Sequence, residues 1–107
     1  MIFVTIDRNS AGCICGFSVR EHGKNEVCAA VSLLTLNTVN SIEALIDEPF
    51  NCEYDPEGGY LRADLPRVRE GRRCPEADLL LESMALGLRS VKDNYRSEIE
   101  IEDDSYD

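Results

Sequence analysis

The single histidine and a nearby cysteine are the side chains with the clearest potential for chemistry. His22 stands six positions before Cys28, and Gly23 lets the segment between them fold back, so the imidazole can approach the thiol. If Asn25 caps a helix, Cys28 lies in its first turn, where free N–H groups and the helix dipole favour a thiolate. The pattern indicates acyl transfer: Cys28 is the nucleophile, His22 the general base, and the N–H groups of Cys28 and Ala29 the oxyanion hole.

A structural role for these side chains remains open. A cysteine beside alanines and valines on a helix is more often a packing residue, and a histidine in a polar loop is more often solvated. Ser32 stands four residues after Cys28, so the same helix face could carry its hydroxyl near the site. The alternative for Ser32 is a hydrogen bond back to the carbonyl oxygen of Cys28.

The cysteines also permit a thiol-rich metal or redox module. Five cysteines, an odd number, favour free thiols over a disulfide framework in a chain without an export signal. Four potential soft ligands fall within sixteen residues: Cys13, Cys15, His22 and Cys28. Because the spacing lacks the paired Cys-x-x-Cys motifs of zinc sites, the metal site is the weaker hypothesis, and no cofactor is expected.

Hydrophobic periodicity predicts the elements that must position Cys28. An apolar stripe at three- and four-residue steps predicts a helix from Asn25 to just before Pro49. Alternating apolar residues predict a β-hairpin on each side of this helix, over residues 2–19 and 50–65.

The second half of the chain adds another helix and an edge strand. The helix is expected over residues 75–95 and the strand over residues 97–101, which gives the order β-β-α-β-β-α-β. This order predicts an α+β fold in which two β-hairpins plus an edge strand form one sheet, covered on one face by two amphipathic helices. Residues 1–101 are expected to be a single domain and residues 102–107 an acidic, disordered tail. Four arginines on the polar connection over residues 66–73 are expected to be solvated or to pair with this tail: Arg67, Arg69, Arg72 and Arg73.

Length and charge limit the classes of protein. The chain has 107 residues and a formal net charge of −10, with six acidic residues among the last ten. This charge repels phosphate, so a basic peptide or protein is a more natural partner than nucleic acid. No apolar run approaches the roughly twenty residues of a membrane helix, and the N-terminus lacks an export signal, so we expect no membrane partner and a cytoplasmic protein.

Several strings of the sequence resemble the ribosomal-processing cysteine protease (Prp) family. Residues 21–32, EHGKNEVCAAVS, are similar to the family's E-Y-G-x-D-I-V-C-A-A-V-S, and residues 38–40 match its following T/S-V-N. Residues 58–61 match its second hairpin, and residues 79–95 match its C-terminal helix. The resemblance runs from the first strand to about Ile101, which is nearly the whole chain.

This resemblance implies a cysteine endopeptidase that removes a short N-terminal extension from ribosomal large-subunit protein twenty-seven during ribosome assembly. Cys28 matches the family's nucleophile, and an upstream histidine is the family's base. The region cleaved in the family is rich in basic residues, which suits an acidic protease electrostatically. Family members are homodimers, so the resemblance also implies a homodimer here.

The segment before Cys28 departs from the family pattern, which has a longer stretch between a Gly-His-Ala motif and its cysteine. Here five residues separate His22 from Cys28. Aligned from the N-terminal side, His22 matches the base and the loop is shortened, which implies an open cleft or lost gating. Aligned from the cysteine side, Gly16 falls at the base. This implies either an enzyme with a displaced base or an inactive relative that binds a basic ribosomal-protein segment or an assembly factor. Asn25 replaces the family's aspartate and can cap the helix or orient an imidazole, but it supplies no negative charge.

Overall fold

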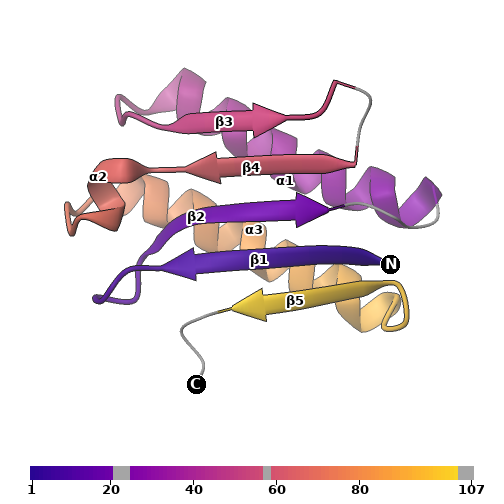
Figure 1. Cartoon of the computed structure of the whole chain (residues 1–107). Coiled ribbons are helices and arrows are strands. Elements are labelled where there is room, and N and C mark those ends of the chain that lie inside the picture. Colours follow the sequence, from indigo (N-terminus) through magenta and orange to yellow (C-terminus); the bar gives the residue numbers. More distant parts are fainter. Residues whose placement is uncertain (21–24, 57–58, 104–107) are drawn as a thin grey trace.

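The computed structural model describes residues 1–20, 25–56 and 59–103 of the chain. The elements along these residues are β1 (Ile2–Arg8), β2 (Ile14–Arg20), α1 (Asn25–Leu45), β3 (Asn51–Tyr54), β4 (Tyr60–Asp64), α2 (Pro66–Arg69), α3 (Pro75–Asn94) and β5 (Ile99–Asp103). The strands form one sheet in the order β3-β4-β2-β1-β5, in which only the β1–β5 pair is parallel. The long helices α1 and α3 cover the same face of this sheet (Figure 1). The predicted α+β fold is therefore confirmed, with the short helix α2 as an addition.

The hydrophobic core lies between the sheet and the two long helices. Every second residue of β1 is buried in it, and Ile2, Val4 and Ile6 are each at most 1% exposed. The antiparallel register places Phe17 and Val19 of β2 beside Ile6 and Val4, so the same face continues across the sheet. Burial of such side chains is worth about 1.5–3 kcal/mol each, which is what holds the helices on the sheet.

The two long helices approach each other closely at Gly87 of α3. A Cβ atom added there would lie 2.8 Å from Cδ2 of Leu34 on α1, closer than real side-chain contacts allow. The glycine thus lets α1 lie directly against α3. By length and mean hydropathy (1.3 over Glu26–Leu45) α1 also passes the criterion for a membrane-crossing helix, which core helices of soluble proteins pass as well.

The C-terminal strand extends two residues beyond the boundary predicted at Ile101. Glu102 and Asp103 belong to β5 instead of to an acidic tail, and residues 104–107 lie outside the described part of the chain. Asp103 is held in the strand because its carboxylate accepts hydrogen bonds from Nε of Arg8 at 2.9 Å and from Nη2 of Arg89 at 3.1 Å. A count of acidic residues could not reveal these partners, which come from β1 and α3.

The connection predicted as polar over residues 66–73 begins with the helix α2. Pro66 suits the first position of a helix, and Val68, which is 3% exposed, anchors this turn in the core. Two arginines of this connection pair with acidic residues elsewhere in the fold, and not with the tail residues that the structure describes. Arg69 donates to Asp64 and to Asp7, and Arg72 pairs through Nε with Glu48 at 3.1 Å.

Candidate active site

Cys28 lies in the first turn of α1, as the sequence predicts. The helix begins at Asn25, so Cys28 is its fourth residue, and its free thiol is half-buried against the core. Val27 and Val31 on either side are fully buried, which fixes the rotation of this turn on the sheet. The first turn of a helix carries partial positive charge and backbone N–H groups that have no partner within the helix. The position therefore suits a nucleophile.

The oxyanion-hole prediction depends on where α1 begins. It assumed that Asn25 is the cap, whereas Asn25 is the first helical residue. In an α-helix each N–H donates to the carbonyl oxygen four positions earlier, so the N–H of Ala29 belongs to the intrahelical ladder. The acceptor of the Ala29 N–H is the carbonyl group of Asn25, and the role of the Cys28 N–H stays a prediction.

The predicted base and its orienting residue are not described by the structure. His22 and the side chain of Asn25 lie outside the described part of the chain. β2 ends at Arg20 and α1 begins at Asn25, so four residues connect the two elements. The role of His22 as general base and that of Asn25 as its positioning residue stay predictions.

Gly16, the alternative position for the family's base, lies inside the sheet. It pairs with Asp7 of β1 and with Asp64 of β4. A Cβ atom there would lie 2.9 Å from Nη2 of Arg69 and 3.0 Å from a backbone oxygen of β4. From Gly16 the strand continues to Arg20, a rise of about 13 Å at 3.3 Å per residue, before the chain turns toward α1. A side chain at this position would be crowded and remote from the start of α1.

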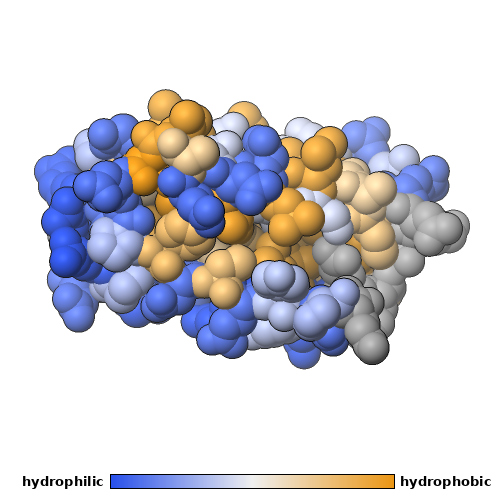
Figure 2. All heavy atoms as spheres, turned by 90° about the horizontal axis from the view of Figure 1, so that it is seen from above, coloured by the Kyte–Doolittle hydropathy of each residue, from blue (hydrophilic) through white to orange (hydrophobic). Residues whose placement is uncertain are grey.

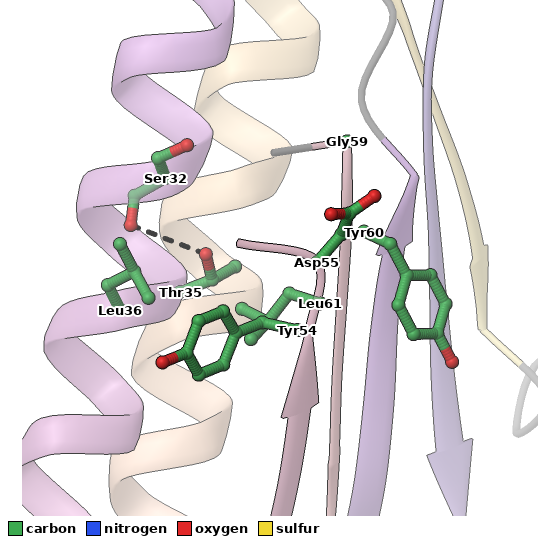
Figure 3. A pocket seen from close by; sticks show the side chains of 8 residues that line it. All are labelled: Ser32, Thr35, Leu36, Tyr54, Asp55, Gly59, Tyr60 and Leu61. Atoms are coloured by element: carbon green, nitrogen blue, oxygen red, sulfur yellow. Dashed lines mark hydrogen bonds between the residues drawn. The ribbon is translucent and has the colours of Figure 1, made fainter. Parts of the chain in front are cut away.

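A pocket opens beside Ser32, between α1 and the β3–β4 hairpin (Figure 3). Its volume is about 130 Å³, and most of its lining is apolar. The lining residues are Ser32, Thr35, Leu36, Tyr54, Asp55, Gly59, Tyr60 and Leu61. Leu36, Tyr54 and Leu61 gather around the pocket, whereas the ring of Tyr60 extends over the other side of the hairpin (Figure 3).

Sequence reasoning placed Ser32 near the site but missed the rest of this pocket. The four-residue steps from Cys28 to Ser32 and Leu36 do mark one side of a helix. Nothing in the sequence indicated that Tyr54 and Leu61 would face that side, because the packing of the hairpin against α1 is a tertiary contact.

Thr35 is the most deeply buried polar residue of the pocket. Its hydroxyl donates to the carbonyl oxygen of Val31 at 2.9 Å and lies 3.3 Å from that of Ser32 (Figure 3). The hydrogen bonds of this hydroxyl are therefore made within α1, and Thr35 needs no ligand to satisfy it. Ser32 is half-buried one turn after Cys28, in agreement with its predicted place on the same helix face.

The cysteines proposed as metal ligands are not brought together. Cys13 directly precedes β2 and Cys15 is its second residue, whereas Cys28 follows the far end of that seven-residue strand. Cys15 is fully buried, its Sγ donates to the carbonyl oxygen of Asp7, and burial raises the pKa of its thiol. No group of three or more potential metal ligands occurs within residues 1–20, 25–56 and 59–103. The described structure therefore gives no support to the metal module.

Comparison with known proteins gives one consistent match. Residues 1–100 match the model of a family described as cysteine protease Prp. The ribosomal processing cysteine protease Prp of Bacillus subtilis is 26% identical over 107 residues, covering 94% of this chain and 96% of the relative. The essential ribosomal processing protease Prp of S. aureus, solved with a covalently linked product peptide, superposes with a TM-score of 0.85 at 28% identity, over 96% of this chain and 99% of that one. The same S. aureus protease solved with a substrate peptide gives a TM-score of 0.82 at 25% identity, with the same coverage of both chains.

Proposed function

Because the chain belongs to the cysteine protease Prp family, and is a cysteine endopeptidase of ribosomal processing, we propose that its substrate is ribosomal large-subunit protein twenty-seven. The cleavage removes a short N-terminal extension during ribosome assembly. The observation that carries this proposal is the position of Cys28: a half-buried thiol in the first turn of α1, one helical turn from a pocket large enough for a substrate side chain. The S. aureus relative solved with a substrate peptide has the same fold over nearly its whole length.

The proposed reaction uses Cys28 and His22 in two steps. His22 accepts the thiol proton while the sulfur of Cys28 attacks the carbonyl carbon, and the imidazolium then protonates the leaving amine. Water, deprotonated by the same imidazole, hydrolyses the thioester and releases the second product. The backbone N–H of Cys28 stabilises the oxyanion of both tetrahedral intermediates. Asn25 and Ser32 act as positioning residues around this pair.

The place of Gly16 supports His22 as the base. A Cβ atom at position 16 would lie 3.0 Å from the carbonyl oxygen of Ala63, and four further residues of β2 separate this position from the end of the strand. The segment that joins β2 to α1 leads directly to the turn that carries Cys28, and His22 is within it. The alignment that matches His22 to the family's base is therefore favoured over the alignment that places Gly16 at that position.

The charge of the chain supports a basic substrate segment. With a net charge of −10, the protein attracts a peptide rich in lysine and arginine over distances of about a Debye length, roughly 8 Å at physiological salt. The same charge disfavours direct binding to nucleic acid or to an anionic membrane surface. A cytoplasmic location is proposed with this substrate, and the five free thiols suit a reducing compartment.

We also propose that the protein is a homodimer. Large apolar side chains stand exposed on the outer surfaces of α1 and α3: Leu33, Leu45, Leu79 and Leu86 are each at least 65% exposed. Hydrophobic residues gather on the side of the molecule that carries α1 and β3 (Figure 2). Apolar patches of this kind mark interaction surfaces, and a second copy would cover them.

Sedimentation equilibrium should give twice the mass of one chain, and Leu33→Glu with Leu86→Glu should give a monomer; a monomeric wild-type protein would contradict the proposal.

The function is tested by intact-mass measurement. The purified protein is incubated with the extended ribosomal protein from the same organism, beside a Cys28→Ala control. A mass loss at one peptide bond that is absent in the control supports the protease, and His22→Ala should then abolish the loss. If the wild-type protein binds the substrate without cleaving it, the chain is an inactive relative that recognises a basic segment.

A further inference from the structure

We propose that the cleft between the β1–β2 turn and the connection from α2 to α3 binds the phosphate group of a small phosphomonoester, such as a nucleoside monophosphate. The cleft has a volume of about 390 Å³, within the roughly 300–1,000 Å³ of small-molecule sites. It lies at the end of the sheet that carries α2, whereas α1 begins at the opposite end, so this site is separate from that of Cys28 (Figure 1). The lining residues are Asn9, Ala11, Cys13, Gly71, Arg72 and Arg73.

The first argument is the charge of the cleft. The chain has a formal net charge of −10, yet the lining contains two arginines and no acidic residue. Arg73 is exposed, and in the described part of the fold no ion pair joins it to an acidic residue. A guanidinium presents its N–H groups in a planar fork that matches two oxygens of a phosphate. The cleft therefore favours an anionic group of this shape.

The second argument is the orientation of Arg72. Its Nε lies 3.1 Å from Oε1 of Glu48, whose side chain is only 1% exposed, whereas 51% of the arginine side chain is exposed. The buried carboxylate thus holds the arginine from the side of the protein. Because a guanidinium has five N–H donors, one carboxylate at Nε leaves donors for a second anion in the cleft.

The third argument is that the two walls of the cleft are already joined to each other. Oδ1 of Asn9 accepts hydrogen bonds from the N–H groups of Ala11 and Cys13 at 2.9 and 3.0 Å, which closes the β1–β2 turn. Nδ2 of Asn9 donates to the carbonyl oxygen of Val68 at 2.8 Å, and the N–H of Gly71 donates to the same oxygen at 3.0 Å. Since these bonds hold both walls before a ligand arrives, little conformational entropy is lost on binding.

The fourth argument concerns the size of the anion. A phosphomonoester carries a charge of about −1.5 to −2 at pH 7, which two guanidinium groups neutralise. A long polyanion would extend beyond the cleft and meet the acidic remainder of the molecule, which repels it. The ligand inferred is therefore a small phosphomonoester, and a strand of RNA is the alternative that the experiment distinguishes.

Binding is measured by isothermal titration calorimetry on the full chain at about 150 mM salt. The probes are adenosine monophosphate (AMP), adenosine, which lacks the phosphate, and a decanucleotide of adenosine. Arg73→Gln removes one cation of the cleft and leaves the pair between Arg72 and Glu48 in place. Arg96→Gln is the matched control, because Arg96 is exposed and does not line the cleft.

A second measurement locates the bound ligand. Cys13 lines the cleft and has a free thiol, and Cys52 is a free thiol of β3 that does not line it. Bound AMP should slow the alkylation of Cys13 by iodoacetamide and leave that of Cys52 unchanged, as measured by peptide mass spectrometry. Equal alkylation rates of Cys13 with and without bound AMP would show that the ligand lies elsewhere, which overturns the proposal.

AMP should bind at least about tenfold more tightly than adenosine, because the phosphate supplies the contacts to the guanidinium groups. Arg73→Gln should weaken AMP binding by about tenfold or more, and Arg96→Gln should leave it within about twofold. The proposal is wrong if AMP does not bind, if adenosine binds as tightly, or if the two variants weaken AMP equally. A decanucleotide that binds more tightly than AMP, and loses this affinity in Arg73→Gln, would overturn the small ligand in favour of an RNA backbone.

Discussion

The guanidinium of Arg8 and the carboxylate of Asp103 form two parallel hydrogen bonds, Nε to Oδ1 at 2.9 Å and Nη2 to Oδ2 at 3.0 Å. The pair joins β1 to the parallel strand β5, 95 positions later in the chain. Nη1 of Arg8 also donates to Glu82 of α3, and only 7% of the arginine side chain is exposed. These carboxylates raise the pKa of Arg8 further above its ordinary value. The C-terminal strand is thus attached to the sheet and to a helix by one buried cation.

Arg8→Ala should destabilise the protein by about 3–5 kcal/mol, because it removes the buried cation that pairs with both Glu82 and Asp103, although Asp103 keeps its hydrogen bond from Arg89. Urea unfolding measures the change. Arg62→Ala is the matched control, since Arg62 is 40% exposed and lies 3.7 Å from Asp7, and its loss should cost less than about 1 kcal/mol. Equal effects of the two substitutions would contradict the structural role given to Arg8.

Gly87→Val should destabilise the protein by about 1–3 kcal/mol, because its side chain overlaps Leu34 where α1 meets α3. The double variant with Leu34→Ala should recover part of this loss, since the smaller residue makes room for the valine. Thermal unfolding of the single and double variants gives the coupling energy. Additive losses would mean that the helices do not meet at these two residues.

Stability should fall at high pH partly because of Cys15. Burial raises the pKa of this thiol above its ordinary value of 9.0, so in the folded protein it stays protonated while the unfolded chain ionises. The folded state then binds more protons, and the free energy of unfolding decreases as pH rises above about 9; below that pH the contribution is fully present. Urea unfolding at pH 8 and pH 10 should give a larger decrease for wild type than for Cys15→Ala.

A matched control for this pH effect is Cys74→Ala, which removes a half-buried thiol elsewhere in the fold and should keep the wild-type decrease. If Cys15→Ala loses as much stability between the two pH values as wild type does, the buried thiol is not responsible.

Ser32→Ala should lower kcat/KM by up to about tenfold, the value of one hydrogen bond, without changing the urea midpoint. The measurement is cleavage of the extended ribosomal protein, with Ser83→Ala on the exposed side of α3 as control. Rescue of activity by Ser32→Thr would indicate that the hydroxyl positions the reacting groups. Unchanged kcat/KM in Ser32→Ala would mean that the hydroxyl takes no part in the reaction.

The sequence by itself determined the fold class and the place of Cys28, the proposed nucleophile. Residues 25–45 carry a helical stripe that local spacing reveals, and Cys28 falls in its first turn because the helix start is a local property. The alternation in β1 and β2 predicted a hairpin for the same reason, since period two reports which face of a strand is buried.

Only the tertiary structure decided what surrounds Cys28. The pocket joins Leu36 to Leu61 and Tyr54, and no local pattern states which side of α1 the β3–β4 hairpin will cover. Asp103 was assigned to a tail by its composition, yet it belongs to β5 because Arg8 lies beside it in the fold. Local periodicity encodes whether each segment is a helix or a strand. The contacts between distant elements arise only when the core is packed, and the shape of the pocket beside α1 depends on those contacts.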